Sequence, residues 1–451
     1  MHYNAMPQLY TMNRRRFLAS LPIITACTSP KRVTAGEEWR QSNTGHYKAT
    51  SANSELLSQA NAVIATTRQG ACQVRFIGLG GQPMAHQTVE VAQRQSAFEW
   101  GYSDAGLLVK DAADPTEAAL SARVAKAFNI TTAKCYWDER WHQPIEHEQG
   151  QRIYDRFKGE IAWGRAHGMA VKGHPLVWTV PKALPTWFQA LTPSQQLERL
   201  QKHVTSLITQ AGPEVTLWDL ANEMLWEPLL THTQTRKWPH LEPVADWAAF
   251  LSPLFAAARQ ANPKARYGLN DYGLERTYRP EVTAATQRKR YVELAKRLTD
   301  LGTPPDALGT QAHVGEPYTM LEIKTMLDDL AQAGRPVHIT EFWCMPNGPE
   351  EERQQYLQNV MTLCYGHPAV AHFTFWPRDT FFERKTNQAT PIFNLVEKTL
   401  TQTWRTAPLS AQTNADGVVN VQAYFGKHQV VINGKTVEFD LLKPGQVVVQ
   451  V

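Results

Sequence analysis

Two carboxylic acids stand near the ends of stretches that are typical of buried strands. Residues 215–223 (VTLWDLANE) end in Asn222 and Glu223, and residues 336–342 (PVHITEF) carry Glu341. A buried strand usually gives way to turn residues such as Gly, Pro or Ser, so an acid and an amide at its tip need a chemical reason. Two facing carboxyl groups can cleave a glycosidic bond: one protonates the leaving oxygen, and the other attacks the anomeric carbon or activates water.

Further polar and aromatic side chains stand at the ends of other strand-like stretches. Asparagine can hydrogen-bond a sugar hydroxyl, and tryptophan offers a flat apolar face to a sugar ring. Each side chain alone could be a cap or a buried hydrogen-bonded group, but their recurrence is hard to explain by stability. The expected substrate-binding residues are His174, Trp178, Asn222, Asn270, Gln311, His313 and Trp376.

A metal centre fits these residues less well than a sugar site does. His174 and His313 lack an HExxH-like companion, and no additional carboxylate stands at ligand spacing. We therefore expect no metal and no cofactor, and a polysaccharide or oligosaccharide as the substrate.

Alternating strand-like and helix-like stretches must position these side chains. Eight β-rich runs alternate with amphipathic stretches such as 117–129 and 353–366, which predicts an α/β fold, a (β/α)8 TIM barrel with its active site at the carboxyl ends of the strands. A doubly wound sheet has the same alternation, but no Gly-rich nucleotide loop follows any run. The expected strands are 98–103, 131–136, 170–178, 215–223, 265–271, 307–313, 336–342 and 371–377.

Five of these tips carry a family resemblance over residues 98–400. The segments that carry it are GHPLVWT (173–179), WDLANE (218–223), LNDY (269–272), TQAH (310–313) and ITEF (339–342). In this order they resemble the motifs of glycoside hydrolase family 10, the (β/α)8 endo-β-1,4-xylanases. The resemblance implies a retaining glycosidase with Glu223 as acid/base, Glu341 as nucleophile and His313 beside the nucleophile.

The chain departs from the family pattern in the residues that would hold the non-reducing-side sugars. Lys134 and Cys135 stand where the family has Glu and Asn, Thr179 replaces a second His, and Arg378 lies in a shortened WPRD segment. These departures predict an enzyme of the same reaction type with altered glycone subsites. We expect weaker turnover of plain linear xylan than of a decorated or different β-glycan.

Two alternatives remain open at the level of sequence. One is a related barrel glycosidase with a decorated or acidic substrate, because Arg378 could pair with a sugar carboxylate. The other is a catalytically decayed surface lipoprotein that only binds glycans. Retention of both glutamates counts against decay, because two facing carboxylates repel each other and destabilise the fold.

The N-terminal residues have the layout of an export signal. Arg14, Arg15 and Arg16 precede a short apolar run that ends near ITAC (24–27), so residues 1–27 resemble a twin-arginine signal with a lipobox. Cys27 is the expected lipidation site, which predicts a periplasmic or cell-surface protein held at the membrane only by a lipid anchor. We expect a flexible tether over 28–55, a small β-module over 56–97, the catalytic barrel over 98–403 and a C-terminal β-module over 404–451.

Charge and cysteine content bound the other functions. The net charge is +4. Without the three N-terminal arginines, 43 basic residues stand against 42 acidic residues, which gives a net charge of +1. Such a near-neutral body argues against nucleic acid as a partner, and we expect a monomer. No CxxC pair or zinc spacing is present, and we expect buried thiols, with the disulfide state left open, at Cys72, Cys135, Cys344 and Cys364.

Overall fold

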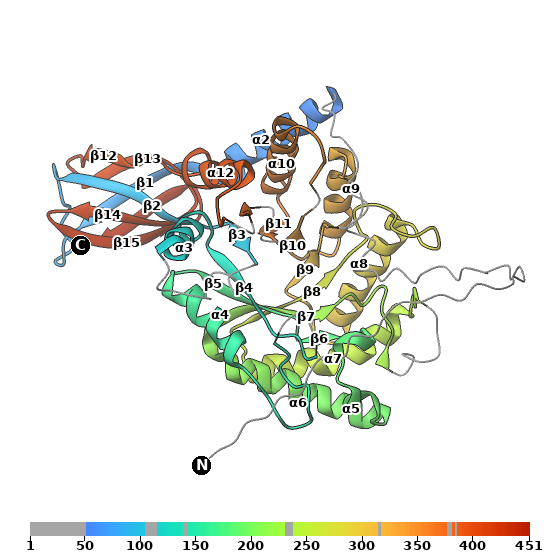
Figure 1. Ribbon diagram of the computed structural model, residues 1–451. Helices are drawn as coiled ribbons and strands as arrows, with labels where there is room; N and C mark the ends of the chain where they lie inside the picture. The colour runs from blue at the N-terminus through green and yellow to red at the C-terminus, as the bar shows by residue number, and fades with distance from the viewer. Residues whose placement is uncertain are drawn as a thin grey trace, which may run out of the picture.

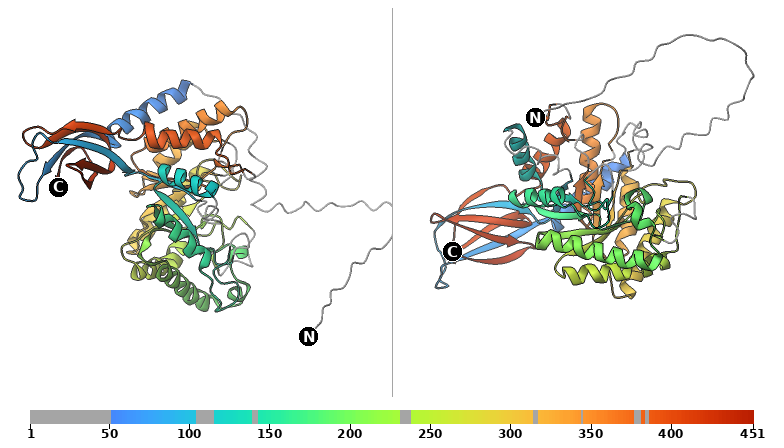
Figure 2. Two further views of the ribbon diagram at one scale, coloured as in Figure 1. Left: turned by 60° about the vertical axis from the view of Figure 1, so that its left-hand side comes forward. Right: turned by 60° about the horizontal axis from the view of Figure 1, so that its bottom comes forward.

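The computed structural model describes residues 51–103, 115–138, 143–230, 238–313, 317–343, 345–376, 381–383 and 386–451. In Figure 1 a barrel of strands and helices carries a β-sandwich on one side, and both views of Figure 2 agree. No helix among these residues is long and apolar enough to cross a membrane.

The strands of the barrel form one parallel sheet that closes on itself. The sheet order is β5-β4-β3-β11-β10-β9-β8-β7-β6, and β5 also pairs with β7, which completes the circle. The (β/α)8 prediction is confirmed, with the strand expected over 170–178 divided into two short pieces. The strands are β3 (Glu99–Tyr102), β4 (Ile130–Lys134), β5 (Ala170–His174), β6 (Val177–Trp178), β7 (Val215–Asn222), β8 (Arg266–Asp271), β9 (Ala307–Thr310), β10 (Val337–Phe342) and β11 (Val370–Phe375).

Helices cover the outside of the barrel. Local chemistry marks their starts, because Thr192 and Thr319 each form a capping box with the residue three positions later, Gln195 and Glu322. The helices of this layer are α3 (Pro115–Ala127), α4 (Asp155–Ala166), α5 (Thr186–Gln189), α6 (Pro193–Ala211), α7 (Val244–Ala261), α8 (Ala284–Asp300), α9 (Met320–Ala331), α10 (Glu350–Tyr365) and α12 (Pro391–Lys398).

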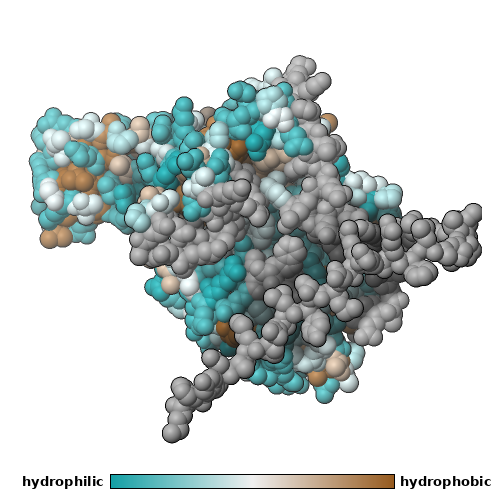
Figure 3. Space-filling model, viewed as in Figure 1, coloured by the Kyte–Doolittle hydropathy of each residue, from teal (hydrophilic) through white to brown (hydrophobic). Residues whose placement is uncertain are grey.

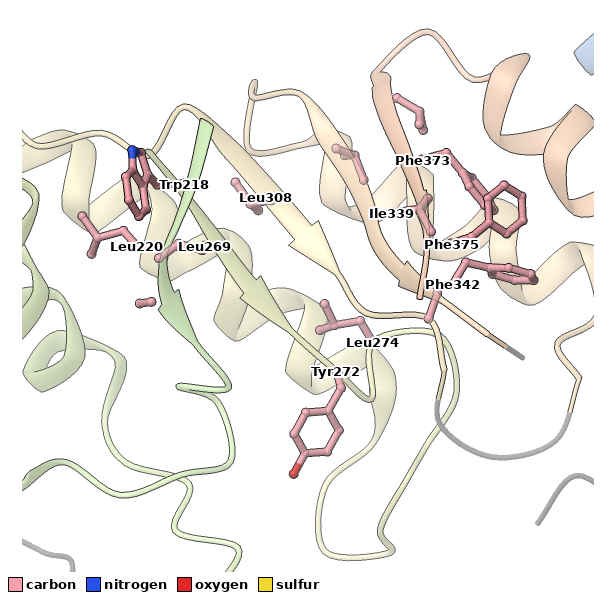
Figure 4. Packing of buried hydrophobic residues seen from close by; sticks show 14 of the residues in the cluster. Trp218, Leu220, Leu269, Tyr272, Leu274, Leu308, Ile339, Phe342, Phe373 and Phe375 are labelled. Atoms are coloured by element: carbon pink, nitrogen blue, oxygen red, sulfur yellow. The ribbon is translucent and has the colours of Figure 1, made fainter. Parts of the chain in front are cut away.

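Apolar side chains fill the space between strands and helices. Figure 4 shows this layer, with Phe342, Phe373 and Phe375 gathered together, and the ring centroids of Phe342 and Phe373 are 5.2 Å apart. Trp218 of β7 meets Phe157 of α4, with ring centroids 6.2 Å apart. Because successive side chains of a strand point to opposite faces, the neighbour Asp219 points into the barrel.

The sandwich is built from both ends of the described chain. Sheet order β13-β1-β16 faces sheet order β12-β2-β14-β15, so the two separate β-modules that the sequence suggested are one unit. Its core includes Val74, Phe76, Val89, Val421 and Val430. The strands are β1 (Gln69–Ile77), β2 (Thr88–Ser96), β12 (Leu409–Gln412), β13 (Val418–Tyr424), β14 (Gly426–Ile432), β15 (Lys435–Leu441) and β16 (Gly445–Gln450).

The boundary expected between tether and β-module was wrong. Residues 51–55 of the expected tether and 56–67 of the expected module form one helix, α2 (Ser51–Thr67). Leu56, Ala60 and Ile64 recur at helical spacing and pack against the barrel core, which explains why this stretch is helical. The tether residues 28–50 and the signal residues 1–27, with Cys27, lie outside the described residues.

The described surface is largely polar. Figure 3 shows mostly hydrophilic residues on one face, with a hydrophobic patch on the sandwich. Cys72, Cys135 and Cys364 are buried free thiols, while Cys344 lies outside the described residues.

Candidate active site

Glu223 follows β7 directly and is turned inward by an unusual backbone conformation. Its φ angle is 62°, in the left-handed region that residues other than glycine rarely adopt. The Glu223 N–H donates to the Asn270 carbonyl (2.8 Å), and the Leu225 N–H donates to Asp271 Oδ2 (2.8 Å). Strand β8 therefore stabilises the turn after β7 that orients the Glu223 side chain.

The surroundings of Glu223 favour its protonated form. Trp178 Nε1 donates to Oε2 (2.8 Å) and Gln311 Nε2 donates to Oε1 (3.1 Å). Burial raises the pKa of Glu223, and the negative charge of Glu341 raises it further, against these two hydrogen bonds. A carboxyl group with a raised pKa is suited to give and retake a proton near neutral pH.

Glu341 in β10 has imidazole and amide partners instead. His313 Nε2 lies 3.2 Å from Oε2, Asn270 Nδ2 donates to Oε1 (2.7 Å), and His174 Nε2 lies 3.9 Å from Oε1. Burial alone would raise the pKa of Glu341, but the hydrogen bonds from His313 and Asn270 and the nearby His174 outweigh it and lower the pKa. The carboxylate form, the form that can attack, is therefore stabilised.

Side-chain amides join the two carboxyl groups into one network. Asn222 Oδ1 accepts from Asn270 Nδ2 (2.9 Å) and from Gln311 Nε2 (3.3 Å). Asn270 thus contacts Glu341 and Asn222, while Gln311 contacts Glu223 and Asn222. Residues that lie in, or directly after, β7, β8, β9 and β10 are hydrogen-bonded together at one end of the barrel.

The remaining expected residues complete one wall of the site. The Trp376 ring stands against the His174 ring, with centroids 5.2 Å apart. All nine residues expected at the site, the two glutamates and the seven predicted to bind substrate, are brought together. Tyr136, which the sequence did not single out, lies between His174 and Trp178 at centroid distances of 5.6 and 5.8 Å.

A buried cluster of charged and polar side chains adjoins the site and was not predicted from the sequence. Asp219 Oδ2 lies 2.7 Å from Lys172 Nζ and 2.7 Å from His174 Nδ1. Burial alone would raise the pKa of Asp219, but Lys172 and His174 outweigh it and lower the pKa to about 2. An ionised carboxylate only accepts hydrogen bonds, so His174 Nδ1 carries a proton and Nε2 faces Glu341. The signal was present as Lys172 and His174 at alternate positions of β5, and as Asp219 among apolar residues of β7.

Glu227 is another buried acid beside the site. Its N–H donates to the Glu223 carbonyl (3.0 Å), one turn after Glu223. Burial, and then the charge of Glu223, raise the pKa of Glu227 to about 8. At neutral pH Glu227 is therefore mainly protonated and adds little negative charge beside Glu223.

This geometry agrees with what sequence comparison finds. The family model for glycosyl hydrolase family 10 matches residues 97–394, more than half of the chain. The chain belongs to glycosyl hydrolase family 10.

Curated relatives of this family-10 chain include xylan-degrading enzymes. It is 24% identical over 323 residues to endo-1,4-β-xylanase 2 of Arabidopsis thaliana, covering 72% of this chain and 28% of that relative. It is 26% identical over 259 residues to endo-1,4-β-xylanase C of Paenibacillus barcinonensis, covering 54% and 23%. Anti-sigma-I factor RsgI6 of Acetivibrio thermocellus is 21% identical over 388 residues, covering 84% and 47%. The chain thus spans less than half the length of each.

Solved structures of family-10 enzymes share the barrel. Xylanase 10B of Thermotoga petrophila, solved with xylobiose, has a TM-score of 0.53 at 18% identity, covering 68% of this chain and 95% of that one. The family-10 structure from Paenibacillus barcinonensis has a TM-score of 0.53 at 20% identity, covering 68% and 95%.

Three of the four departures from the family pattern lie among the described residues. Lys134 ends β4, is buried, and holds its ammonium 4.9 Å from the centroid of the Trp376 ring. Cys135 and Thr179 are buried as well. Arg378 lies outside the described residues, and within the described part no group of three His, Cys, Asp or Glu residues could hold a metal ion.

Proposed function

We propose that the barrel is a retaining endo-1,4-β-xylanase-like glycoside hydrolase, with Glu223 as acid/base and Glu341 as nucleophile. One observation carries the proposal: two carboxyl groups joined through amides have pKa values shifted in opposite directions. The acid is bound by the neutral donors Trp178 and Gln311, and the nucleophile by His313 and Asn270.

In the first step, the Glu341 carboxylate attacks the anomeric carbon while Glu223 gives its proton to the glycosidic oxygen. The leaving sugar departs with that proton, and an ester joins Glu341 to the glycone. In the second step, Glu223 takes a proton from water, the hydroxide attacks the anomeric carbon, and Glu341 leaves as a carboxylate. Two inversions give net retention at the anomeric carbon.

Product stereochemistry tests this mechanism directly. Proton NMR during hydrolysis should show the β-anomer of the new reducing end forming first. A fluorinated glycoside that blocks the second step should leave a covalent sugar on Glu341, found by peptide mass spectrometry. An α-anomer as the first product would contradict the assignment.

The proposed substrate is a β-1,4-linked xylan-type chain, which the relatives named endo-1,4-β-xylanases support. The replacements at Lys134 and Cys135 support altered glycone binding, with weaker turnover of plain linear xylan than of a decorated chain. Turnover of a panel of β-glycans, with sizing of the products, tests this; highest activity on unsubstituted xylan would show that the replacements do not set the preference.

We also propose export and lipidation at Cys27, from the basic and apolar residues that precede it. The wild-type protein should partition with membranes, and Cys27→Ser should release it or block its processing. A cleaved, unlipidated and soluble wild-type protein would contradict this proposal.

A further inference from the structure

A further buried carboxyl group, that of Glu275, is linked through hydrogen bonds to the segment that carries partners of the two proposed catalytic groups. Glu275 lies in the loop after β8 and is 3% exposed. Its Oε2 accepts from the Leu274 N–H (3.1 Å), whereas Oε1 accepts from the Ala312 N–H (3.0 Å) and from the Thr310 hydroxyl. One oxygen of Glu275 therefore binds two groups at the carboxyl end of β9.

The residue that Glu275 binds has an unfavourable backbone conformation. Ala312 has a φ angle of 53°, in the left-handed region, where a β-carbon crowds the backbone. Ala312 is buried, so its N–H would lack water if the Glu275 oxygen were removed. The contact with Glu275 thus stabilises a conformation that alanine would otherwise tend to leave.

The two neighbours of Ala312 are the partners of the two proposed catalytic glutamates. Gln311 Nε2 donates to Glu223 Oε1 (3.1 Å), and His313 Nε2 lies 3.2 Å from Glu341 Oε2. The dihedral angles of Ala312 set the directions of both side chains, so a relaxed Ala312 would shift both contacts together.

We propose that Glu275 is a positioning residue that holds the left-handed turn at Ala312, and through it keeps Gln311 against Glu223 and His313 against Glu341. It would act without touching substrate. The proposal rests on the proposed function, because both glutamates are assigned their roles there. It goes beyond the proposed function in assigning one turn, at Ala312, the alignment of both the acid/base and the nucleophile.

The test compares Glu275→Leu with Glu275→Gln in the full chain. Leucine has a similar size but no acceptor, whereas glutamine keeps an oxygen that can accept from Ala312 and Thr310. With an aryl β-xylobioside, kcat per folded molecule should fall about 100-fold for leucine, the loss typical of misplaced catalytic groups, and less than about tenfold for glutamine. The leucine loss should be similar for good and poor leaving groups, because both glutamates lose a partner.

A matched control is Glu146→Gln, which removes the charge of another buried carboxyl group. Glu146 binds Arg199, the Gly150 N–H and Trp137 Nε1, and its carboxyl group is not hydrogen-bonded to any of the nine residues described at the site. This control should lower the melting temperature and leave kcat per folded molecule unchanged. If Glu275→Leu does not fold, Thr310→Val removes one donor to the same oxygen and should lower kcat by at least about threefold, a loss of the size of one hydrogen bond.

Two kinetic results would overturn the proposal: a leucine variant (or Thr310→Val, if leucine does not fold) with wild-type kcat per folded molecule, or a glutamine variant as impaired as leucine. A crystal structure of the leucine variant, or of Thr310→Val if the leucine variant does not fold, gives a readout that does not need activity. In it His313 should move from Glu341 to a distance beyond about 3.5 Å, outside hydrogen-bond range, and an unmoved His313 would overturn the proposal. If the wild type itself cleaves no β-glycoside, the proposed function fails, and the crystal structure still decides the role of Glu275.

Discussion

Identical side chains acquire different chemistry at the residue scale. Glu223 and Glu341 are both buried, yet the neutral donors around Glu223 fail to offset burial, whereas the imidazoles around Glu341 more than offset it. The order of motifs was sufficient to predict from the sequence that both residues lie at one site. The resemblance implied only a proton donor and a nucleophile, whereas the physical causes of their opposite pKa shifts needed the contacts between strands.

Removing each glutamate should have a different effect. Glu341→Ala removes the proposed nucleophile and should lower kcat by at least about 10⁴-fold on every substrate. Glu223→Ala should lose a similar factor on xylan-type chains but keep substantial turnover of aryl glycosides whose leaving group needs no proton. Steady-state and burst kinetics with a series of aryl leaving groups measure this. Equal losses for both variants across that series would contradict the assigned roles.

The pH profile should respond to His313. Activity requires Glu341 ionised and Glu223 protonated, so it should rise through the lowered pKa of Glu341 and fall through the raised pKa of Glu223. Glu341 in turn raises the pKa of His313 against its burial, so His313 tends to stay charged beside the carboxylate. His313→Asn removes that charge, the pKa of Glu341 should rise, and the acidic limb of kcat/KM should move to higher pH. An unmoved acidic limb would show that His313 does not stabilise the ionised form.

At the scale of elements, the alternation of β-rich and helical stretches predicted the strands of the barrel. It did not predict where a strand is interrupted or where the first helix begins. Each expected strand range overlaps a strand, because each was a compact β-rich run between helical stretches. The division of 170–178 into β5 and β6 was not foreseen. Helix α2 was also missed, because the polar residues at its start hid the helical spacing of Leu56, Ala60 and Ile64.

The Lys172–Asp219 pair joins neighbouring strands β5 and β7 inside the barrel. Asp219→Asn leaves the Lys172 ammonium buried without its counter-charge, which should lower the free energy of unfolding by about 3 kcal/mol or more. Denaturant unfolding monitored by tryptophan fluorescence measures this loss.

The same pair predicts an acid dependence of stability. The folded pKa of Asp219, about 2, lies below its ordinary value of 3.8, so its contribution is complete above about pH 4 and is lost as the pH falls toward 2. The difference in stability between wild type and Asp219→Asn should therefore shrink in acid. A difference that stays constant between pH 5 and pH 2 would contradict this account.

At the scale of the whole molecule, strands from the N-terminal and C-terminal parts of the described chain meet in one domain. β1 pairs with β13 and β16, and β2 pairs with β12 and β14, so neither N-terminal strand has a partner without the C-terminal residues. The sequence predicted β-structure at both ends, but pairing between distant strands leaves no local signal. Arg68, which directly precedes β1, links the sandwich to the barrel because its guanidinium group donates to the carbonyls of Tyr365, His367 and Val370.

Shortening the chain after residue 408 should therefore be worse than deleting the sandwich from both ends. The first change exposes Val74, Phe76, Val89 and Val91 and leaves unpaired strand edges, which favours aggregation. A chain of residues 97–408 keeps the barrel and Trp404, whose ring stacks on Trp100, and should be more soluble than the one-sided deletion although it lacks α2. Size-exclusion chromatography and the soluble fraction compare the two. Co-expressing residues 409–451 with the one-sided deletion should restore solubility, because those residues supply every missing strand. A one-sided deletion that is monomeric and as soluble as the full chain would show that the two ends fold independently.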